Sequence, residues 1–262
     1  MLPEIHLFGL TLQTFGICFA LGFLAAGAII DRRLKELGHP ADHATQIVGA
    51  ALIGGLIGAR GYWVLDNWSE AKDDLIGSIV SGAGLTWYGG AIGGAIAVLA
   101  WSWWRGWFAP GGLRMGLADL CAVPLAMGYA IGRIGCQLSG DGDYGKAWDG
   151  PWAMGYPDGK VATAPGETVH PTPIYETFTM GLLAWGLWQL RDRYRPGILF
   201  ALYLIGAGIE RFLVEFLRRN PDVALGLGTA QFQSLAMVAG GAIWIALAAR
   251  RGPLLKTAPQ VA

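Results

Sequence analysis

The stretch "MGLADLCAVPLAMGYAIGRIGCQLSGDGDYG", residues 115–145, decides the fold class. Residues 115–138 form an apolar run long enough to cross a bilayer as a helix, which takes about 20 residues. Arg133 lies late in this run, and glycines and two aspartates follow it. A cation inside an apolar span is costly unless it faces polar surroundings. The stretch therefore predicts a membrane helix that carries a charge toward a polar interior.

Similar apolar runs recur along the whole chain. We predict further spans at about 8–30, 44–65, 77–103, 172–190, 197–217 and 229–249. The chain is 53% hydrophobic and only 15% charged, whereas about 25% of the residues in an ordinary soluble domain are charged. The N-terminal "MLPEIHLFGL" lacks the basic region of a cleaved signal peptide, so the first span is expected to remain. We therefore predict an all-α polytopic membrane protein, with about seven transmembrane helices in a single integral membrane domain over 1–262.

Glycines are concentrated in the second to fourth spans, as in "GGLIGARG" (54–61) and "YGGAIGGA" (88–95). Small residues let helix backbones approach closely in lipid, so most of these glycines are expected to serve packing. The three cysteines, Cys18, Cys121 and Cys136, form no Cys-x-x-Cys pair. We therefore expect no zinc site and no disulfide framework, and we predict neither a metal nor a cofactor.

The distribution of basic residues predicts the orientation of the chain. One set of loops holds 11 of them: Arg32, Arg33, Lys35, Arg105, Arg114, Arg191, Arg193, Arg195, Arg250, Arg251 and Lys256. The opposite set holds 5: Lys72, Lys146, Lys160, Arg218 and Arg219. The richer set should be cytoplasmic, which puts the N-terminus outside and the C-terminus in the cytoplasm. Residues 139–171 then form a small periplasmic head over the helices.

Three arginines fall inside or at the edge of spans: Arg60, Arg133 and Arg211. Each lies in the outward half of its helix, and a convergence of the three would form an anion site. Forked guanidinium donors suit phosphate. The alternative is that the arginines pair with buried acids. Glu215, at i+4 from Arg211, is one such acid, and Asp119 and Glu210 are others.

The turn after Arg133, "SGDGDYG" (139–145), favours a particular kind of anion. Gly132 and Gly135 beside Arg133 allow close approach by a helix or a ligand. The aspartates of the turn can accept hydrogen bonds from hydroxyl groups, whereas phosphate alone would be repelled by them. The combination points to a phospholipid with a glycerol headgroup.

In these features the chain resembles the prolipoprotein diacylglyceryl transferases. Several stretches have family counterparts in the same order along nearly the whole chain. They are "GGLIGARGYWVL" (54–65), "GLTWYGGAIGG" (84–94), "GRIGCQLSGDGDYG" (132–145), "VHPTPIYE" (169–176), "RPGILFALYLIGAGIERFLVEFLRR" (195–219) and "TAQFQSL" (229–235). The resemblance implies seven membrane helices with a periplasmic head, in the bacterial inner membrane.

The resemblance also implies an activity and its partners. Family members transfer the diacylglyceryl group of phosphatidylglycerol to the thiol of the lipobox cysteine of a preprolipoprotein, and glycerol phosphate leaves. The expected partners are therefore phosphatidylglycerol, a preprolipoprotein signal peptide and the lipid bilayer, with no nucleic acid and no cofactor.

Residue roles follow from the resemblance in the same way. Arg133 and Arg211 are expected to serve the phosphate, with Arg60 assisting. Tyr88 stands at a position where the family has His or Tyr, and where a proton acceptor or hydrogen-bond partner for the thiol is expected. The expected substrate-binding positions are Asp141, His170, Glu215 and Gln231, while Tyr175 and Glu176 match positions that we interpret as structural or binding. His170 could equally be an interfacial residue without contact to substrate.

Departures from the family pattern keep an alternative open. Cys136 stands where Asn is common, and Ala207 and Phe15 stand where Tyr is common. Pro173 replaces a usual Gln. The alternative is a non-catalytic, phospholipid-binding or lipid-handling protein on the same scaffold. A seven-helix photoreceptor or pump is disfavoured, because the last span has no lysine for a Schiff base.

Overall fold

The computed structural model describes residues 1–7, 9–40, 42–72, 74, 77, 86–109, 112–113 and 116–256, without the side chains of Glu70, Trp87 and Tyr88. The chain forms two compact units. Met1–Ile29 and Met115–Ala262 make up the first, and Ile30–Arg114 makes up the second.

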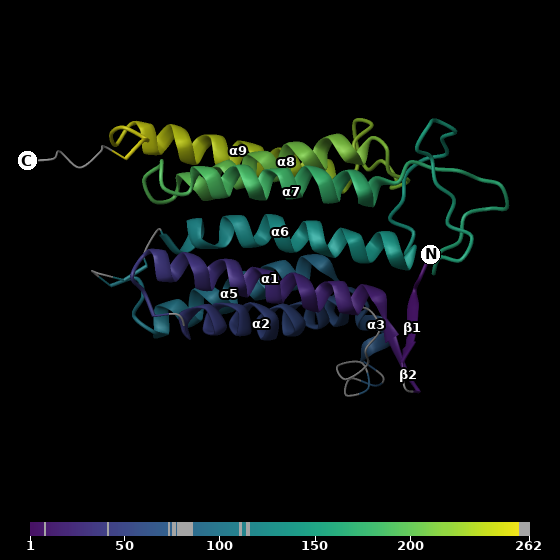
Figure 1. Cartoon of the computed structure of the whole chain (residues 1–262), viewed down its shortest axis with the longest axis horizontal. Coiled ribbons are helices and arrows are strands. Elements are labelled where there is room, and N and C mark those ends of the chain that lie inside the picture. Colours follow the sequence, from purple (N-terminus) through teal and green to yellow (C-terminus); the bar gives the residue numbers. More distant parts are fainter. Residues whose placement is uncertain are drawn as a thin grey trace, which may run out of the picture. The chain divides into compact units, whose positions relative to one another are not determined.

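Long helices dominate the described residues (Figure 1). They are α1 (Thr14–Glu36), α2 (Asp42–Asp66), α5 (Trp87–Trp104), α6 (Gly116–Ser139), α7 (Thr172–Leu190), α8 (Ile198–Glu215) and α9 (Thr229–Ala249), with a short α3 (Trp68–Ala71). Each long helix overlaps a predicted span. Four of them, α1, α2, α6 and α9, are long and apolar enough to cross a membrane. The fold is therefore that of a mostly helical, polytopic membrane protein.

The first predicted span, 8–30, was wrong at its start, because residues 4–7 and 10–13 pair as strands. Strands β1 (Glu4–Leu7) and β2 (Leu10–Gln13) pair antiparallel, and α1 begins only at Thr14. Gly9 has φ +80° between the strands, a conformation that glycine adopts without strain. On one face, Gln13 donates to Glu4 over 2.7 Å. The prediction of an all-α chain therefore missed this small sheet.

In the first unit, α6, α7, α8 and α9 pack around a core rich in small residues. Ala122, Ala126 and Ala130 recur every four residues along one face of α6, and they pack with Met180 and Ala184 of α7. Helix α1 also approaches α6 closely. A side chain at Gly135 would lie 2.9 Å from Cys18 Cβ, whereas one at Gly132 would meet nothing within 4 Å. Of the two glycines beside Arg133, Gly135 is therefore the one that permits close approach.

Asp119, which the sequence offered as a possible partner for an arginine, instead caps the start of α8. Its carboxylate accepts hydrogen bonds from the backbone N–H groups of Gly197, over 2.7 Å, and Phe200, over 2.8 Å. The first N–H groups of a helix have no partner within the helix, so this contact satisfies two of them. It ties α6 to α8 at the ends that lie away from residues 140–171.

In the second unit, α2 and α5 pack through glycine, as the sequence predicts. Added side chains at Gly54 and Gly93 would come within 2.6 and 2.3 Å of the carbonyl oxygen of the opposite glycine. The same holds for Gly58 and Gly89, at 2.2 Å in each direction. The two helices therefore touch through their backbones.

Most of the residues predicted as a head, 140–171, form a segment without helix between α6 and α7, at one end of these helices (Figure 1), and we call this segment the head. Its small core contains Tyr144, Tyr156 and Val169. Isolated bridges join Ala147 and Met154 to Val169. A further bridge joins Gly145 to Arg218, so the chain that leaves α8 is part of the head.

Candidate functional site

Three arginines of the first unit meet around one buried carboxylate. Arg133 lies on α6 and Arg211 on α8, while Arg218 follows the end of α8. Glu176, in the second turn of α7, is fully buried. Its carboxylate oxygens lie 3.2 Å from Arg133 Nε, 3.5 Å from Arg211 Nη1 and 3.5 Å from Arg218 Nη1. We call Arg133, Arg211 and Arg218 the arginine cluster.

Tyr129 holds Arg133 and Glu176 in place. It precedes Arg133 by one helical turn, so both side chains lie on the same face of α6. The Tyr129 hydroxyl donates to Glu176 Oε1 over 2.7 Å and accepts from Arg133 Nη2 over 2.9 Å. The Arg133 guanidinium also lies over the Tyr129 ring, 4.9 Å from its centroid. These contacts fix the guanidinium in one orientation.

Asp143 brings the head to the arginine cluster, because its carboxylate pairs with both Arg133 and Arg218. Burial alone would raise the pKa of Asp143, but the two guanidinium groups hold that pKa below its usual range. Asp141 behaves in the opposite way. Burial and the neighbouring Asp143 raise the pKa of Asp141. The two aspartates of one turn therefore favour different protonation states.

Glu215 completes the ion pairs of the cluster. Its Oε2 lies 2.7 Å from Arg211 Nη2, so this pair, which the sequence offered as part of the alternative to an anion site, is present. It also lies 3.8 Å from Arg218 Nε, and Asn220 donates to the other carboxylate oxygen over 2.7 Å. Three arginines thus share three carboxylates, those of Asp143, Glu176 and Glu215. A guanidinium carries five N–H donors, so this sharing leaves donors for a phosphate.

The cluster differs in one member from the predicted set of Arg60, Arg133 and Arg211. Arg60 is buried in the second unit, with its guanidinium 4.4 Å from the centre of the Trp63 ring. Tyr88 also belongs to that unit, in the first turn of α5, and its side chain lies outside the described residues. Arg218, which we counted among the loop residues, takes the third place.

His170 lies in the head among aromatic rings rather than in the arginine cluster. It stacks on Trp148, with the ring centroids 4.4 Å apart and the planes 10° apart. Its Nδ1 lies 3.3 Å from the Tyr175 hydroxyl, which also accepts a hydrogen bond from Trp152. Gln231 is buried at the start of α9, where its side-chain oxygen accepts from the backbone N–H of Gly228 over 2.9 Å.

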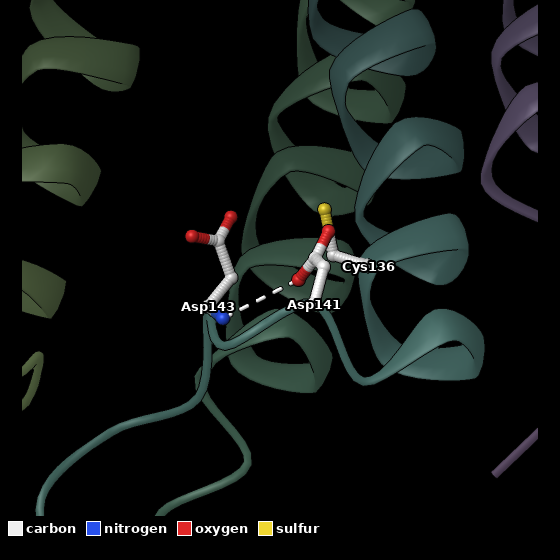
Figure 2. A group of neighbouring side chains, drawn as sticks. All are labelled: Cys136, Asp141 and Asp143. Carbon is white, nitrogen blue, oxygen red and sulfur yellow. Dashed lines mark hydrogen bonds between the residues drawn. The ribbon is translucent and has the colours of Figure 1, made fainter. Parts of the chain in front are cut away.

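Cys136, Asp141 and Asp143 form a group with the donor atoms that metals bind, within 4.8 Å of one another. Figure 2 shows the Asp141 carboxylate beside the Cys136 sulfur, with the backbone N–H of Asp143 directed at Asp141. Arg133 already supplies positive charge here. Its Nη1 lies 3.6 Å from Cys136 Sγ and pairs with Asp143. We therefore interpret Cys136, Asp141 and Asp143 as neighbours of the arginine cluster.

Sequence reasoning left Arg218, Tyr129 and Asp143 out of the site. The spacings contained a signal for the first two. Arg218 follows Arg211 by two helical turns and Glu215 by one, and Tyr129 precedes Arg133 by one. The choice between Asp141 and Asp143 had no such signal, because only the path of the turn decides which carboxylate reaches the arginines.

Comparison with known proteins gives one consistent family. A family model described as prolipoprotein diacylglyceryl transferase matches residues 3–247. A phosphatidylglycerol–prolipoprotein diacylglyceryl transferase of Clostridium tetani is 35% identical over 88% of this chain and 90% of its own. Proteins with the same name from Clostridium perfringens, where it carries the number 2, and Erythrobacter litoralis are 30% and 31% identical. These alignments cover 90% and 91% of this chain and 91% and 86% of the relatives.

Proposed function

The chain belongs to the prolipoprotein diacylglyceryl transferase family, and from that premise we propose a reaction. It transfers the diacylglyceryl group of phosphatidylglycerol to the lipobox cysteine thiol of a preprolipoprotein and releases glycerol phosphate. The observation that carries the proposal is the arginine cluster around the buried Glu176. The reaction is a substitution without redox change, so it needs no redox cofactor.

The arginine cluster suits the leaving group of this reaction. The thiol sulfur forms a bond to the glycerol carbon, and the bond from that carbon to the phosphate oxygen breaks. Negative charge then grows on the departing phosphate. Guanidinium groups held in place beforehand stabilise such charge without reorganising during the reaction. We assign the phosphate to Arg133 and Arg211, with Arg60 assisting.

The remaining predicted residues are proposed to bind substrate around this centre. Asp141, in the turn beside Arg133, is proposed to accept hydrogen bonds from the glycerol headgroup. Glu215 orients Arg211, with which it pairs over 2.7 Å. His170 and Gln231 are proposed to line the path of substrate at the head and at the start of α9.

Tyr88 is proposed to contact the thiol, and Arg211 the phosphate. Replacing Tyr88 by Phe should abolish transfer while phosphatidylglycerol binding stays largely intact. Replacing Arg211 by Ala should weaken both. The measurements are transfer to a lipobox peptide and binding of phosphatidylglycerol to the purified protein. Wild-type activity in Tyr88→Phe would make Tyr88 a packing aromatic and overturn its assignment.

The topology proposed with this function has seven spans, with the N-terminus outside and the C-terminus in the cytoplasm of a bacterial inner membrane. The 11-to-5 division of basic residues supports it. A reporter fused after Val169 should read as external, and one fused after Arg193 as cytoplasmic. The reverse pattern would overturn the orientation.

A second candidate is a non-catalytic, phospholipid-binding protein on the same scaffold. The departures favour it, and one of them, Cys136, lies directly beside Arg133 in the cluster. Complementation separates the two functions. A bacterial strain depleted of its own transferase should grow when it expresses this chain. Failure to grow, despite good expression in the membrane, would favour the second candidate.

A further inference from the structure

Glu210 is a carboxylate at the edge of the arginine cluster that takes part in no ion pair with the residues that the structure describes. It directly precedes Arg211 on α8 and is half-buried. Glu176, Arg211 and Arg133 are close enough to interact with it electrostatically. Those arginines nevertheless pair with Asp143, Glu176 and Glu215, and among the described residues Glu210 has one hydrogen-bond partner, Thr179 of α7. Its carboxylate is therefore available for another role.

The contact between Thr179 and Glu210 can be made with a proton on the Glu210 carboxyl group. The Thr179 hydroxyl oxygen lies 2.8 Å from the carbonyl oxygen of Tyr175 and 3.3 Å from that of Glu176. It lies 3.3 Å from Glu210 Oε1. A hydroxyl has one hydrogen but two lone pairs, so it cannot donate to all three oxygens. When the Thr179 hydrogen points at Tyr175, the contact with Glu210 is best satisfied by a proton on the Glu210 carboxyl.

The position of Glu210 along the helices matches that of the reacting carbon. Helix α7 starts at the head, and Thr179 follows Glu176 by about 4.5 Å of helix. Helix α8 ends at the head, and Glu210 precedes Glu215. Thr179 therefore lies farther from the head than Glu176, and the backbone of Glu210 lies farther from it than those of Arg211 and Glu215. In phosphatidylglycerol the glycerol carbon that the thiol attacks lies on the acyl-chain side of the phosphate. With the phosphate on the arginines, this carbon lies toward Glu210.

We propose that Glu210 is a catalytic residue that accepts the proton of the substrate thiol, and that Thr179 positions it. This inference rests on the proposed function. The thiol proton passes to a Glu210 oxygen, and the sulfur electron pair forms the bond to the glycerol carbon. The electron pair of the broken carbon–oxygen bond stays on glycerol phosphate. Glu210 then releases its proton to the departing phosphate or to water.

This assignment makes Tyr88 a hydrogen-bond partner of the thiol rather than the final proton acceptor. A phenol with an ordinary pKa near 10 is a poor base at neutral pH. A general base contributes about 10² to 10⁴ in rate. Among the described residues, Glu210 contacts Thr179 of α7 and interacts electrostatically with Glu176 of α7, Arg133 and Tyr129 of α6, and Arg211 beside it on α8.

The test uses the full chain with phosphatidylglycerol vesicles and a lipobox peptide. Glu210→Gln should lower kcat about 100-fold or more, with phosphatidylglycerol binding close to wild type. The control is Glu36→Gln, the same substitution at the last residue of α1, which should leave kcat unchanged. Because a free thiol ionises near pH 8.5, the Glu210→Gln rate should rise about eightfold from pH 7 to pH 8 and so recover toward wild type.

The outcomes separate the inference from the function on which it rests. No transfer by the wild-type chain would contradict the proposed function itself. A Glu210→Gln rate near wild type, or a loss that does not recover at high pH, would overturn the role of Glu210 alone. Weakened phosphatidylglycerol binding with unchanged kcat would also overturn it. If Glu210→Gln fails to fold, Glu210→Asp decides, because it keeps the carboxylate and should retain the wild-type pH profile at a reduced kcat.

Discussion

The α2–α5 pair and the α6–α8 bundle bring helices together by opposite means. In the α2–α5 pair, glycines leave no side chain between the two backbones. In the α6–α8 bundle, the fully buried carboxylate of Glu176 pairs with Arg133 of α6, Arg211 of α8 and Arg218 after the end of α8. Lipid gives little hydrophobic drive for helix association, so close packing and polar contacts both serve it. The comparison teaches that the α2–α5 pair relies on backbone contact with a few hydrogen bonds from Trp101 and Thr86, whereas the α6–α8 bundle concentrates buried ion pairs where chemistry is proposed.

The largest effect is expected from the charged bundle. Arg133→Lys should lower the transfer rate nearly as much as Arg133→Ala, on the order of 10² or more. An ammonium keeps the charge but cannot supply the two-pronged contact to phosphate or hold Tyr129 and Glu176 together. The measurement is the initial rate of transfer to a lipobox peptide. Near-normal turnover in the Lys variant would show that only the charge of Arg133 matters.

The glycine-packed pair should respond through its stability. Gly58→Val forces atoms into the backbone of α5, because even a Cβ would lie 2.2 Å from the carbonyl oxygen of Gly89. Overpacking of this kind costs about 1 to 3 kcal/mol. Gly49→Val on the same helix is the matched control, since its Cβ would meet nothing within 4 Å. Thermal unfolding in detergent should rank the two, and an equal loss in both would contradict backbone contact as the cause.

The head allows a finer test, with two aspartates of one turn. Asp143→Asn should cost about 1 to 2 kcal/mol at pH 7, because it removes the partner of Arg133 and Arg218 at a partly exposed site. Asp141→Asn should be neutral or slightly stabilising there, because burial and Asp143 raise the pKa of Asp141 and disfavour its charge.

The pH dependence follows from the direction of each shift. The pKa of Asp143 is lowered, so its contribution is complete above the unfolded value near 3.9 and is lost as the pH falls through the folded pKa. The contribution of Asp141 to the free energy of unfolding is complete below the unfolded pKa and is lost as the pH rises through its raised folded pKa. Unfolding midpoints between pH 7 and pH 3.5 test this. A penalty for Asp143→Asn that already vanishes at pH 5 would contradict it.

The smallest effect is expected at the cap of α8. Asp119→Ala removes the acceptor for the N–H groups of Gly197 and Phe200 and should cost about 1 kcal/mol. Asp119→Asn keeps one acceptor oxygen and should cost less. Unfolding midpoints of the two variants provide the check, and an Ala variant as stable as wild type would show that solvent replaces the cap.

Sequence reasoning recovered the helices well, because long apolar runs have few alternatives. It began the first span at residue 8, whereas Gly9 lies in a turn and residues 10–13 pair as a strand. At the site, spacing along one helix identified the Arg211–Glu215 pair. Contacts between helices were harder to predict. The role of Glu176 as the common partner of three arginines depends on three separate segments, and no spacing within one segment encodes it.

The contact between Asp119 and Gly197 also sets a distance. Arg133 follows Asp119 by 14 residues on α6, and Arg211 follows Gly197 by 14 residues on α8. Both helices run from this contact toward the head, and 14 residues span about 21 Å of α-helix. The Asp119 carboxylate, at the far end of the bundle, therefore aligns α6 and α8 so that equal lengths of helix follow the contact. This alignment places the Arg133 and Arg211 guanidinium groups at the same depth, although Asp119 contacts neither of them.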